Sequence, residues 1–279
     1  MTFSIIVVCR NAGEKLNKTI ESIRRQTIDD YEIVVQDGFS TDGSVERLAV
    51  ENAGENLKIY REKDAGIYDA MNRAVAHASG RYLFFLNCGD YFQDETVLAQ
   101  VKEEIVRTAG RKTPGIFYGN IFERATGALV MSNPKIDGFA CYRNVPCHQA
   151  CFYDRRLLKK RGFRICYQVR ADYEHFLWCY YKARAAMYYM PVTVASYEGD
   201  GFSETRENKR RSLVEHTHIV GKYMSRKQII RYRLILLATL APLRTYLAQN
   251  PATAELYQKI KRKMYEGEIE KSQHGGRYK

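Results

Sequence analysis

The stretch Arg61–Phe92, REKDAGIYDAMNRAVAHASGRYLFFLNCGDYF, decides the fold of this 279-residue chain. Its first half is expected to form a helix with one face toward a core. Apolar residues recur there at helical spacing: Ile67, Ala70, Met71, Ala74, Val75 and Ala78. Gly80 is placed to cap this helix. The continuous apolar run Tyr82–Leu86 is typical of a strand covered on both faces, and Asn87–Asp90 ends it with turn-forming residues.

The segments before and after this stretch repeat the order of strand and helix. Buried strands are predicted at Ser4–Val8, Tyr31–Val35, Leu57–Tyr60 and Val192–Tyr197. Helices are expected after the first two strands, on the apolar spacings of Leu16, Ile20 and Ile23 and of Val45, Leu48 and Ala49. Alternation at this spacing predicts an α/β fold with a mainly parallel sheet, whose ligands bind at the carboxyl edge of its strands.

Three carboxylates follow three different predicted strands. Asp37, Asp64 and Asp90 each come just after a strand, so a parallel sheet would gather them on one rim. Each has a structural alternative: Asp37 bracing its turn, Asp64 capping the next helix, and Asp90 lying solvated in a loop. Turn chemistry alone explains three equivalent placements poorly, so this rim is the expected chemical site.

The positive charge of the chain is concentrated in its C-terminal part. Residues 206–279 hold 17 lysines and arginines against 6 acidic residues, which is +11 of the net +12. We therefore expect a nearly neutral domain over residues 1–205 and a basic helical region over residues 206–279. A basic region of this kind suits an anionic partner, either a membrane surface or a nucleic acid.

Two further features indicate the compartment. No apolar run reaches the length of about 18 residues that a membrane span requires, and no basic leader precedes the first strand. The seven cysteines are odd in number and form no C-x-x-C pair, which favours reduced thiols. We expect a cytoplasmic protein, peripheral at most on the inner face of the cytoplasmic membrane.

Several motifs in order resemble the family 2 glycosyltransferases of the GT-A fold. They are QDGFSTDGS at 36–44, EKDAGIYDAMNRAVAHASG at 62–80, FLNCGDYF at 85–92, His148–Phe152 and Ala171–Glu174. The resemblance covers roughly residues 3–205 and is greatest to bacterial enzymes that build exopolysaccharide or lipopolysaccharide repeat units. It implies a transferase that uses a UDP- or GDP-linked sugar.

The resemblance also implies which residues bind that donor. Asp37 would contact the base or ribose, and further pocket residues would be Cys9, Asn11, Asp64, Gly66, Asn72, Asn87 and His148. Asp90 would hold Mg²⁺ or Mn²⁺, because a hard cation on carboxylate oxygen stabilises a leaving diphosphate. The usual D-x-D pattern reads Asn87-Cys88-Gly89 here, which leaves the dependence on metal open.

By the same resemblance, Asp172 is the catalytic base at the start of a helix. It would take a proton from the acceptor hydroxyl while that oxygen attacks the anomeric carbon and inverts its configuration. An N-cap is its structural alternative, and Glu174 is the weaker candidate for the base. His148 and Gln149 would position acceptor or diphosphate unless His148 is a core residue. Gly199–Gly201 would form a mobile loop over the donor.

In the segment Ser225–Leu247, Arg226, Lys227, Arg231 and Arg233 stand beside an apolar centre. This centre is too short and too interrupted by Pro242 to span a bilayer, but it is long enough to lie in the interface. Packing on the catalytic domain is the alternative. The expected function is therefore an inverting glycosyltransferase that adds a sugar to a lipid-linked glycan in bacterial surface polysaccharide synthesis. The rival functions are a nucleic-acid-binding protein that uses the basic region and a sugar-phosphate nucleotidyltransferase.

Overall fold

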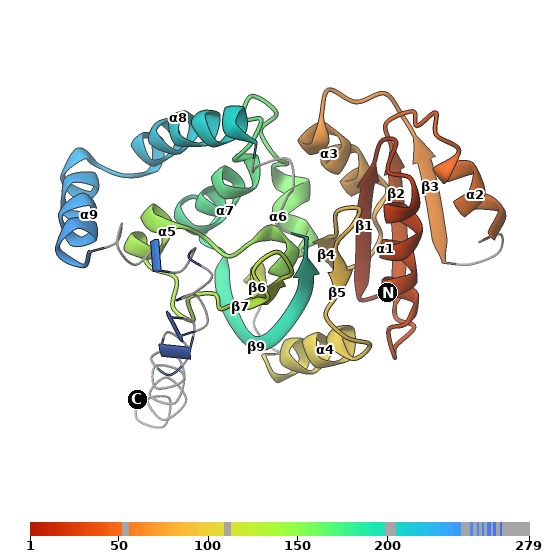
Figure 1. Cartoon of the computed structure of the whole chain (residues 1–279), viewed down its shortest axis with the longest axis horizontal. Helices are drawn as coiled ribbons and strands as arrows, with labels where there is room; N and C mark the ends of the chain where they lie inside the picture. Colours follow the sequence, from red (N-terminus) through yellow and green to blue (C-terminus); the bar gives the residue numbers. More distant parts are fainter. Residues whose placement is uncertain are drawn as a thin grey trace.

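A nine-stranded mixed sheet between two layers of helices forms the body of the molecule (Figure 1). The computed structural model describes residues 1–51, 56–108, 113–198 and 205–240, with scattered positions between 246 and 263. The strands are β1 (Phe3–Cys9), β2 (Tyr31–Asp37), β3 (Leu57–Arg61), β4 (Tyr82–Phe85), β5 (Tyr91–Phe92), β6 (Gly115–Glu123), β7 (Ala128–Val130), β8 (Cys151–Asp154) and β9 (Ala186–Tyr197). The helices are α1 (Glu14–Arg24), α2 (Ser44–Glu51), α3 (Ile67–His77), α4 (Val97–Arg107), α5 (Gly138–Arg143), α6 (Arg155–Lys160), α7 (Ala171–Tyr181), α8 (Arg206–Tyr223) and α9 (Arg226–Ala238), with one 3₁₀ turn, η1 (His148–Ala150).

The strand order is β3-β2-β1-β4-β8-β6-β9-β5, and β7 pairs with β6. The first four strands of this order are parallel to one another, whereas β8 is antiparallel to both of its neighbours. The register sets Cys9 opposite Asp37 and Asp37 opposite Arg61. The predicted α/β fold is confirmed, and the carboxyl ends of β1, β2, β3 and β4 meet at one edge of the sheet.

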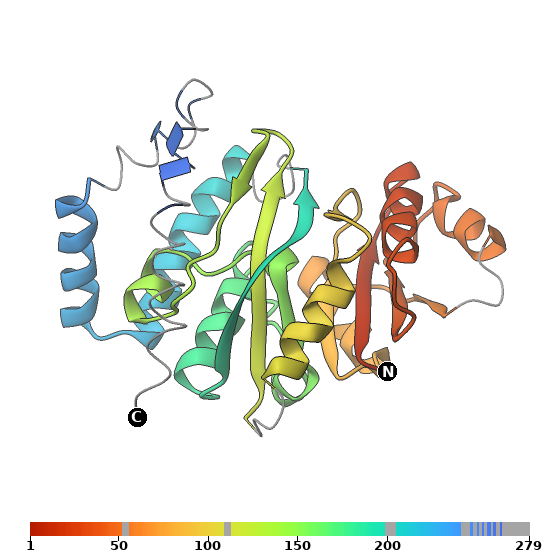
Figure 2. The same cartoon turned by 90° about the horizontal axis from the view of Figure 1, so that it is seen from below.

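Two apolar clusters bury the two faces of the sheet. Helices α1, α2 and α4 contribute Leu16, Leu48 and Val101 to the cluster on one face. Helices α3, α6 and α7 contribute to the cluster on the other face, for example Met71 and Phe176. Figures 1 and 2 show these helices flanking the sheet on its opposite sides. This continuous apolar burial on both faces is why the strands read as unbroken apolar runs in the sequence.

The central helix α3 starts as expected and ends differently. Gly66 is its N-cap residue, with φ of 124°, a left-handed conformation that favours glycine. At the other end the helix stops at an extended Ala78, so the expected capping role of Gly80 is wrong. Gly80 is required by close packing instead: a Cβ there would lie 2.5 Å from the backbone of Phe3 and Ser4.

Helix α8 belongs to the same packed unit as the strands before it. Its Ile219 and Val220, together with Met224 just after it, are buried in the cluster that also holds the core of α7. The shift in charge after residue 205 therefore marks an exposed surface and not the end of the packed core. Helix α9 has no buried side chain and lies at the end of the molecule opposite α2 (Figures 1 and 2).

The expectations about a membrane span and about the loop over the donor can be compared with the described residues only. No helix within the described ranges is long and apolar enough to cross a membrane. The expected loop Gly199–Gly201 and Pro242 of the C-terminal segment lie outside the described residues.

Candidate active site

A cavity of about 540 Å³ opens at the carboxyl edge of the parallel strands. Its walls come from three segments: Val8–Arg10 at the end of β1, Asp64–Ala70 at the start of α3, and Ile165, Tyr167 and Gln168 in the loop before α7. Of the residues predicted from the sequence, Cys9, Asp64 and Gly66 line this cavity directly. It lies where an open parallel sheet is expected to bind ligands.

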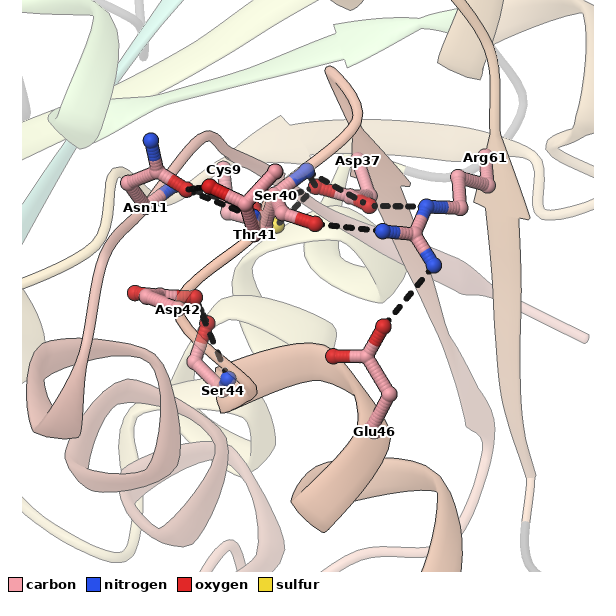
Figure 3. Close-up of polar contacts among 9 residues, drawn as sticks. All are labelled: Cys9, Asn11, Asp37, Ser40, Thr41, Asp42, Ser44, Glu46 and Arg61. Carbon is pink, nitrogen blue, oxygen red and sulfur yellow. Dashed lines mark hydrogen bonds and ion pairs between the residues drawn. The ribbon is translucent and has the colours of Figure 1, made fainter.

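Asp37 at the end of β2 is buried and holds the following loop in place. Its Oδ1 accepts hydrogen bonds from the backbone N–H of Ser40 (2.9 Å) and from Ser40 Oγ (2.6 Å). Its Oδ2 lies 3.2 Å from Nε of Arg61, which also pairs with Glu46 (Figure 3). The carboxylate is fully shielded from solvent, so the structure gives Asp37 the bracing position of the structural alternative.

Asn11 and Cys9 tie the end of β1 to the same loop (Figure 3). The backbone N–H of Asn11 donates to Ser40 Oγ, and Asn11 Oδ1 accepts from the N–H of Thr41, both at 2.8 Å. The Sγ of Cys9 lies 3.9 Å from Oδ1 of Asp37. These contacts fix two loops side by side at the rim of the cavity.

Asp64 packs against the glycine that follows Asp37. A Cβ on Gly38 would lie 2.5 Å from Oδ2 of Asp64, so any other residue at position 38 would displace this carboxylate. The other oxygen of Asp64 accepts the N–H of Gly66 at 3.0 Å, just before α3 begins. Asp64 thus orders the start of α3, as in its structural alternative, and it also lines the cavity.

A chain of polar side chains runs beside the cavity from α3 to the end of β4. Tyr68, which lines the cavity, donates its hydroxyl to Oδ1 of Asp172 at 3.0 Å. Oδ2 of Asp172 lies 3.1 Å from Nδ1 of His148, and Nε2 of His148 lies 3.2 Å from Nδ2 of Asn87. Three of the residues predicted for the site are therefore in one contiguous network.

The environment of Asp172 keeps its carboxyl ionised. Burial raises its pKa, but hydrogen bonds from His148, from the backbone N–H of Tyr173 and from the Tyr68 hydroxyl outweigh burial and leave the pKa lowered. The side chain is 26% exposed. An ionised, partly exposed carboxylate at the N-terminus of α7 is equipped to accept a proton.

Comparison with known proteins matches residues 4–162 to the family model "Glycosyl transferase family 2". The chain belongs to glycosyltransferase family 2. It is therefore an enzyme of glycosyl transfer, in agreement with the motifs that suggested the family.

Two relatives and two solved structures place this glycosyltransferase more closely. It is 37% identical over 212 residues to a "PGL/p-HBAD biosynthesis glycosyltransferase" of Mycobacterium bovis, which covers 74% of this chain and 81% of the relative. It is 32% identical over 198 residues to an uncharacterized glycosyltransferase of Mycobacterium tuberculosis, covering 69% and 72%. S. aureus TarS 1–349 superposes with a TM-score of 0.65 at 15% identity (88% of this chain and 78% of that one), and the mannosyltransferase PcManGT of Pyrobaculum calidifontis with 0.61 at 19% identity (94% and 80%). At such identities these two structures show the GT-A fold alone.

Asp90 of the glycosyltransferase is more enclosed than a metal ligand was expected to be. It is 4% exposed, and its two oxygens accept from Gln149 Nε2 and from the backbone N–H of Glu198, both at 3.0 Å. Burial raises its pKa, against the lowering effect of these hydrogen bonds. Within the described ranges no three His, Cys, Asp or Glu side chains are grouped to hold a metal. Asp37, Asp64 and Asp90 thus share one edge of the sheet without forming a protein-only metal site.

Two other predicted residues have structural partners in this glycosyltransferase. Asn72 brackets the backbone of Phe163, with its Nδ2 donating to the carbonyl and its Oδ1 accepting from the N–H, both at 2.8 Å. Glu174 is fully buried and accepts from Arg161, Lys222 and Tyr223 at 2.5–2.6 Å. Glu174 therefore joins α7 to α8, and its carboxylate is not available to a substrate.

Sequence reasoning missed several residues of the site. Tyr68 lies in a recognised motif but off the apolar stripe of α3, and nothing in its spacing pointed to Asp172. Arg10, Ile165 and Gln168 line the cavity from irregular segments, which carry no periodicity. The sequence could have suggested them as site residues only because Arg10 follows a predicted strand and the other two precede a predicted helix.

Proposed function

We propose that this glycosyltransferase moves one sugar from a nucleoside-diphosphate sugar to a hydroxyl of a glycan acceptor, with inversion at the anomeric carbon. The observation that supports it best is the position of Asp172. Its ionised carboxylate is connected through one hydrogen bond to Tyr68, a residue of the cavity wall.

In this proposal Asp172 is the general base. Its carboxylate accepts the proton of the acceptor hydroxyl while that oxygen forms a bond to the anomeric carbon. The bond from the anomeric carbon to the diphosphate oxygen breaks on the opposite face, so the configuration inverts. His148 orients the base: with the Asn87 amide donating to Nε2, its Nδ1 carries the proton that is donated to Asp172.

The cavity would hold the donor. Its volume of about 540 Å³ is within the usual range for small-ligand sites. TarS and PcManGT have been solved with UDP-GlcNAc and with GDP-Man and Mn²⁺ respectively, which supports a UDP- or GDP-linked sugar here. Cys9, Asp64 and Gly66 would contact the nucleotide, and Asn11 and Asp37 would fix the loops around it.

A divalent cation would enter with the diphosphate. Magnesium sites of this kind use one or two protein oxygens together with substrate phosphates. Oδ1 of Asn87 is buried and has no hydrogen-bond partner, so the site offers one such oxygen. The carboxylate of Asp90, three residues along the same loop, would be the second. Bound there, Mg²⁺ or Mn²⁺ would offset the charge that develops on the leaving diphosphate.

The acceptor would be a lipid-linked glycan of bacterial surface polysaccharide or lipopolysaccharide synthesis, reached at the inner face of the cytoplasmic membrane. The mycobacterial relative is named for PGL/p-HBAD biosynthesis, which supports a glycoconjugate product. Helix α9 supports a peripheral membrane contact, because it exposes Ile230, Leu234 and Leu237 beside Arg226, Lys227 and Arg231. Each basic side chain near anionic lipid contributes about 1 kcal/mol.

A panel of nucleotide sugars tests the proposed function. The protein should release UDP or GDP from one of them, faster when an acceptor glycan is present. Release of pyrophosphate from a nucleoside triphosphate and a sugar phosphate would instead indicate the nucleotidyltransferase alternative.

A further inference from the structure

Glu215 of α8 reaches across to the chain that enters α7. Its Oε1 accepts the backbone N–H of Gln168 at 2.8 Å, and its Oε2 accepts the N–H groups of Val169 (3.1 Å) and Arg170 (2.8 Å). The side chain is 8% exposed. One carboxylate therefore takes three consecutive backbone donors in a nearly dry setting, where such charge-assisted bonds are strong.

The residue at the N-cap of α7 offers no capping side chain. This residue is Arg170, whose side chain accepts no hydrogen bond from the first turn. The backbone N–H groups at and before a helix start are left without intrahelical acceptors, and they favour negative charge. Glu215 supplies negative charge there from another helix: it accepts the N–H of Arg170 and of the two residues before it, whereas the N–H of Tyr173 in the first turn is taken by Asp172 at 2.8 Å.

The three clamped residues reach the site from two directions. Gln168 is part of the cavity wall. The carbonyl oxygen of Val169 lies 2.9 Å from the Tyr68 hydroxyl, next to Oδ1 of Asp172, which lies 3.0 Å from the same hydroxyl. Arg170 immediately precedes the turn that carries Asp172. A displacement of this backbone would therefore move the cavity wall and the base together.

Other contacts of α8 hold the same segment. Ser212 Oγ accepts from Nε of Arg170 at 2.7 Å, and Nδ1 of His218 lies 3.3 Å from the hydroxyl of Tyr167. Helix α8 therefore stabilises the segment that forms one wall of the cavity, in addition to exposing basic side chains on the surface.

We propose that Glu215 is a positioning residue for glycosyl transfer: it clamps residues 168–170 so that the cavity wall and Asp172 keep the geometry that transfer requires. This inference rests on the proposed function for its effect on rate, whereas the clamp itself can be measured without any reaction.

The test variant is Glu215→Gln, which keeps the size of the side chain but removes the charge and turns an amide N–H toward one of the three donors. Two controls accompany it on the same helix. Glu207→Gln makes the same change at a side chain that is 80% exposed, and Ile219→Val trims the buried face of α8 without touching the clamp.

Backbone hydrogen exchange is the readout that does not depend on activity. In the Glu215→Gln protein, the amides of residues 168–170 should exchange about tenfold faster or more, while those of the central sheet stay protected. Ile219→Val should not single out these three amides. Unchanged exchange at residues 168–170 in Glu215→Gln would overturn the clamp.

Transfer kinetics then test the positioning role. Glu215→Gln should lower kcat by about tenfold or more, since small misplacements of catalytic groups are costly, and it should also raise the donor KM because Gln168 lies in the cavity wall. Both controls should keep their kcat, even if Ile219→Val loses as much thermal stability. Equal kcat losses in Glu215→Gln and Ile219→Val would mean a merely structural role. A wild-type protein that transfers no sugar would refute the proposed function and leave the exchange result to decide the clamp.

Discussion

Nδ1 of His148 lies 3.1 Å from Oδ2 of Asp172, and this contact connects the two halves of the site. His148 belongs to η1 and reaches Asn87 at the end of β4 with its other ring nitrogen. Asp172 belongs to the first turn of α7. Asn87, which is assigned to the diphosphate side, and Asp172, which is assigned to the acceptor side, therefore both contact the imidazole ring of His148.

Removing that ring should change the pH dependence of transfer. His148 lowers the pKa of Asp172, so His148→Ala should raise this pKa. Transfer needs the ionised carboxylate, and the acid limb of kcat/KM should therefore move to higher pH. Profiles of kcat/KM from about pH 3 to 8 measure this, with His77→Ala, at the end of α3, as the control. An acid limb unchanged from that of the wild type would show that His148 does not tune the base.

Glu174→Gln should mainly destabilise the fold. The buried carboxylate pairs with Arg161 and Lys222, and breaking such a pair costs about 3 kcal/mol or more. Burial raises the pKa of Glu174, but these partners leave it lowered, so its contribution to stability is present above the unfolded pKa and lost as pH falls through the folded pKa. Urea unfolding at pH 7 measures the loss. A variant as stable as wild type that had lost transfer would make Glu174 the base.

A nucleoside diphosphate should raise the melting temperature, and Mn²⁺ should raise it further. At 100 times Kd the ligand adds about 2.7 kcal/mol to stability, and a chain of this size gains roughly 2–4 °C per kcal/mol. Asn87→Ala should remove the part that depends on Mn²⁺, whereas Asp37→Asn should weaken binding with or without metal. If EDTA abolishes the difference in melting temperature rise between Asn87→Ala and wild type, Asn87 is supported as a metal ligand. A difference that persists in EDTA contradicts that role.

Membrane contact should depend on the exposed apolar residues of α9. Leu234→Glu should reduce sedimentation with anionic vesicles about tenfold, because it removes an exposed leucine that would enter the membrane interface and adds a repelled charge. Val50→Glu is the matched control, since Val50 is an exposed apolar residue of α2 at the opposite end of the molecule. Equal vesicle binding by both variants would exclude α9 from the contact.

The sequence was sufficient for the fold and for the edge of the sheet that carries the site. Strands at Ser4–Val8 and Tyr31–Val35 could be predicted because both faces of each are covered, which leaves an unbroken apolar run. Gly80 was assigned to the wrong task, since a glycine that permits close packing and a glycine that caps a helix look alike in a sequence.

The internal order of the site could not be predicted in the same way. The roles of Asp37 and Glu174 depend on partners such as Arg61 and Lys222, which are distant in sequence and have no periodic relation to them. Glu215 was hidden by the net charge of its region, because a count of charges cannot distinguish one buried acid from the exposed bases around it. A tertiary contact decides each of these roles.

The central claim is that Asp172 is the base for transfer, and Asp172→Asn tests it most directly. Asparagine keeps the size of the side chain and removes the proton acceptor, so donor binding should be nearly unchanged while kcat falls about 10²-fold or more. Donor affinity by calorimetry and transfer rate on the same preparation give both values. A variant that binds donor normally and transfers no more than about a hundredth as fast supports the account; one that transfers at near the wild-type rate contradicts it.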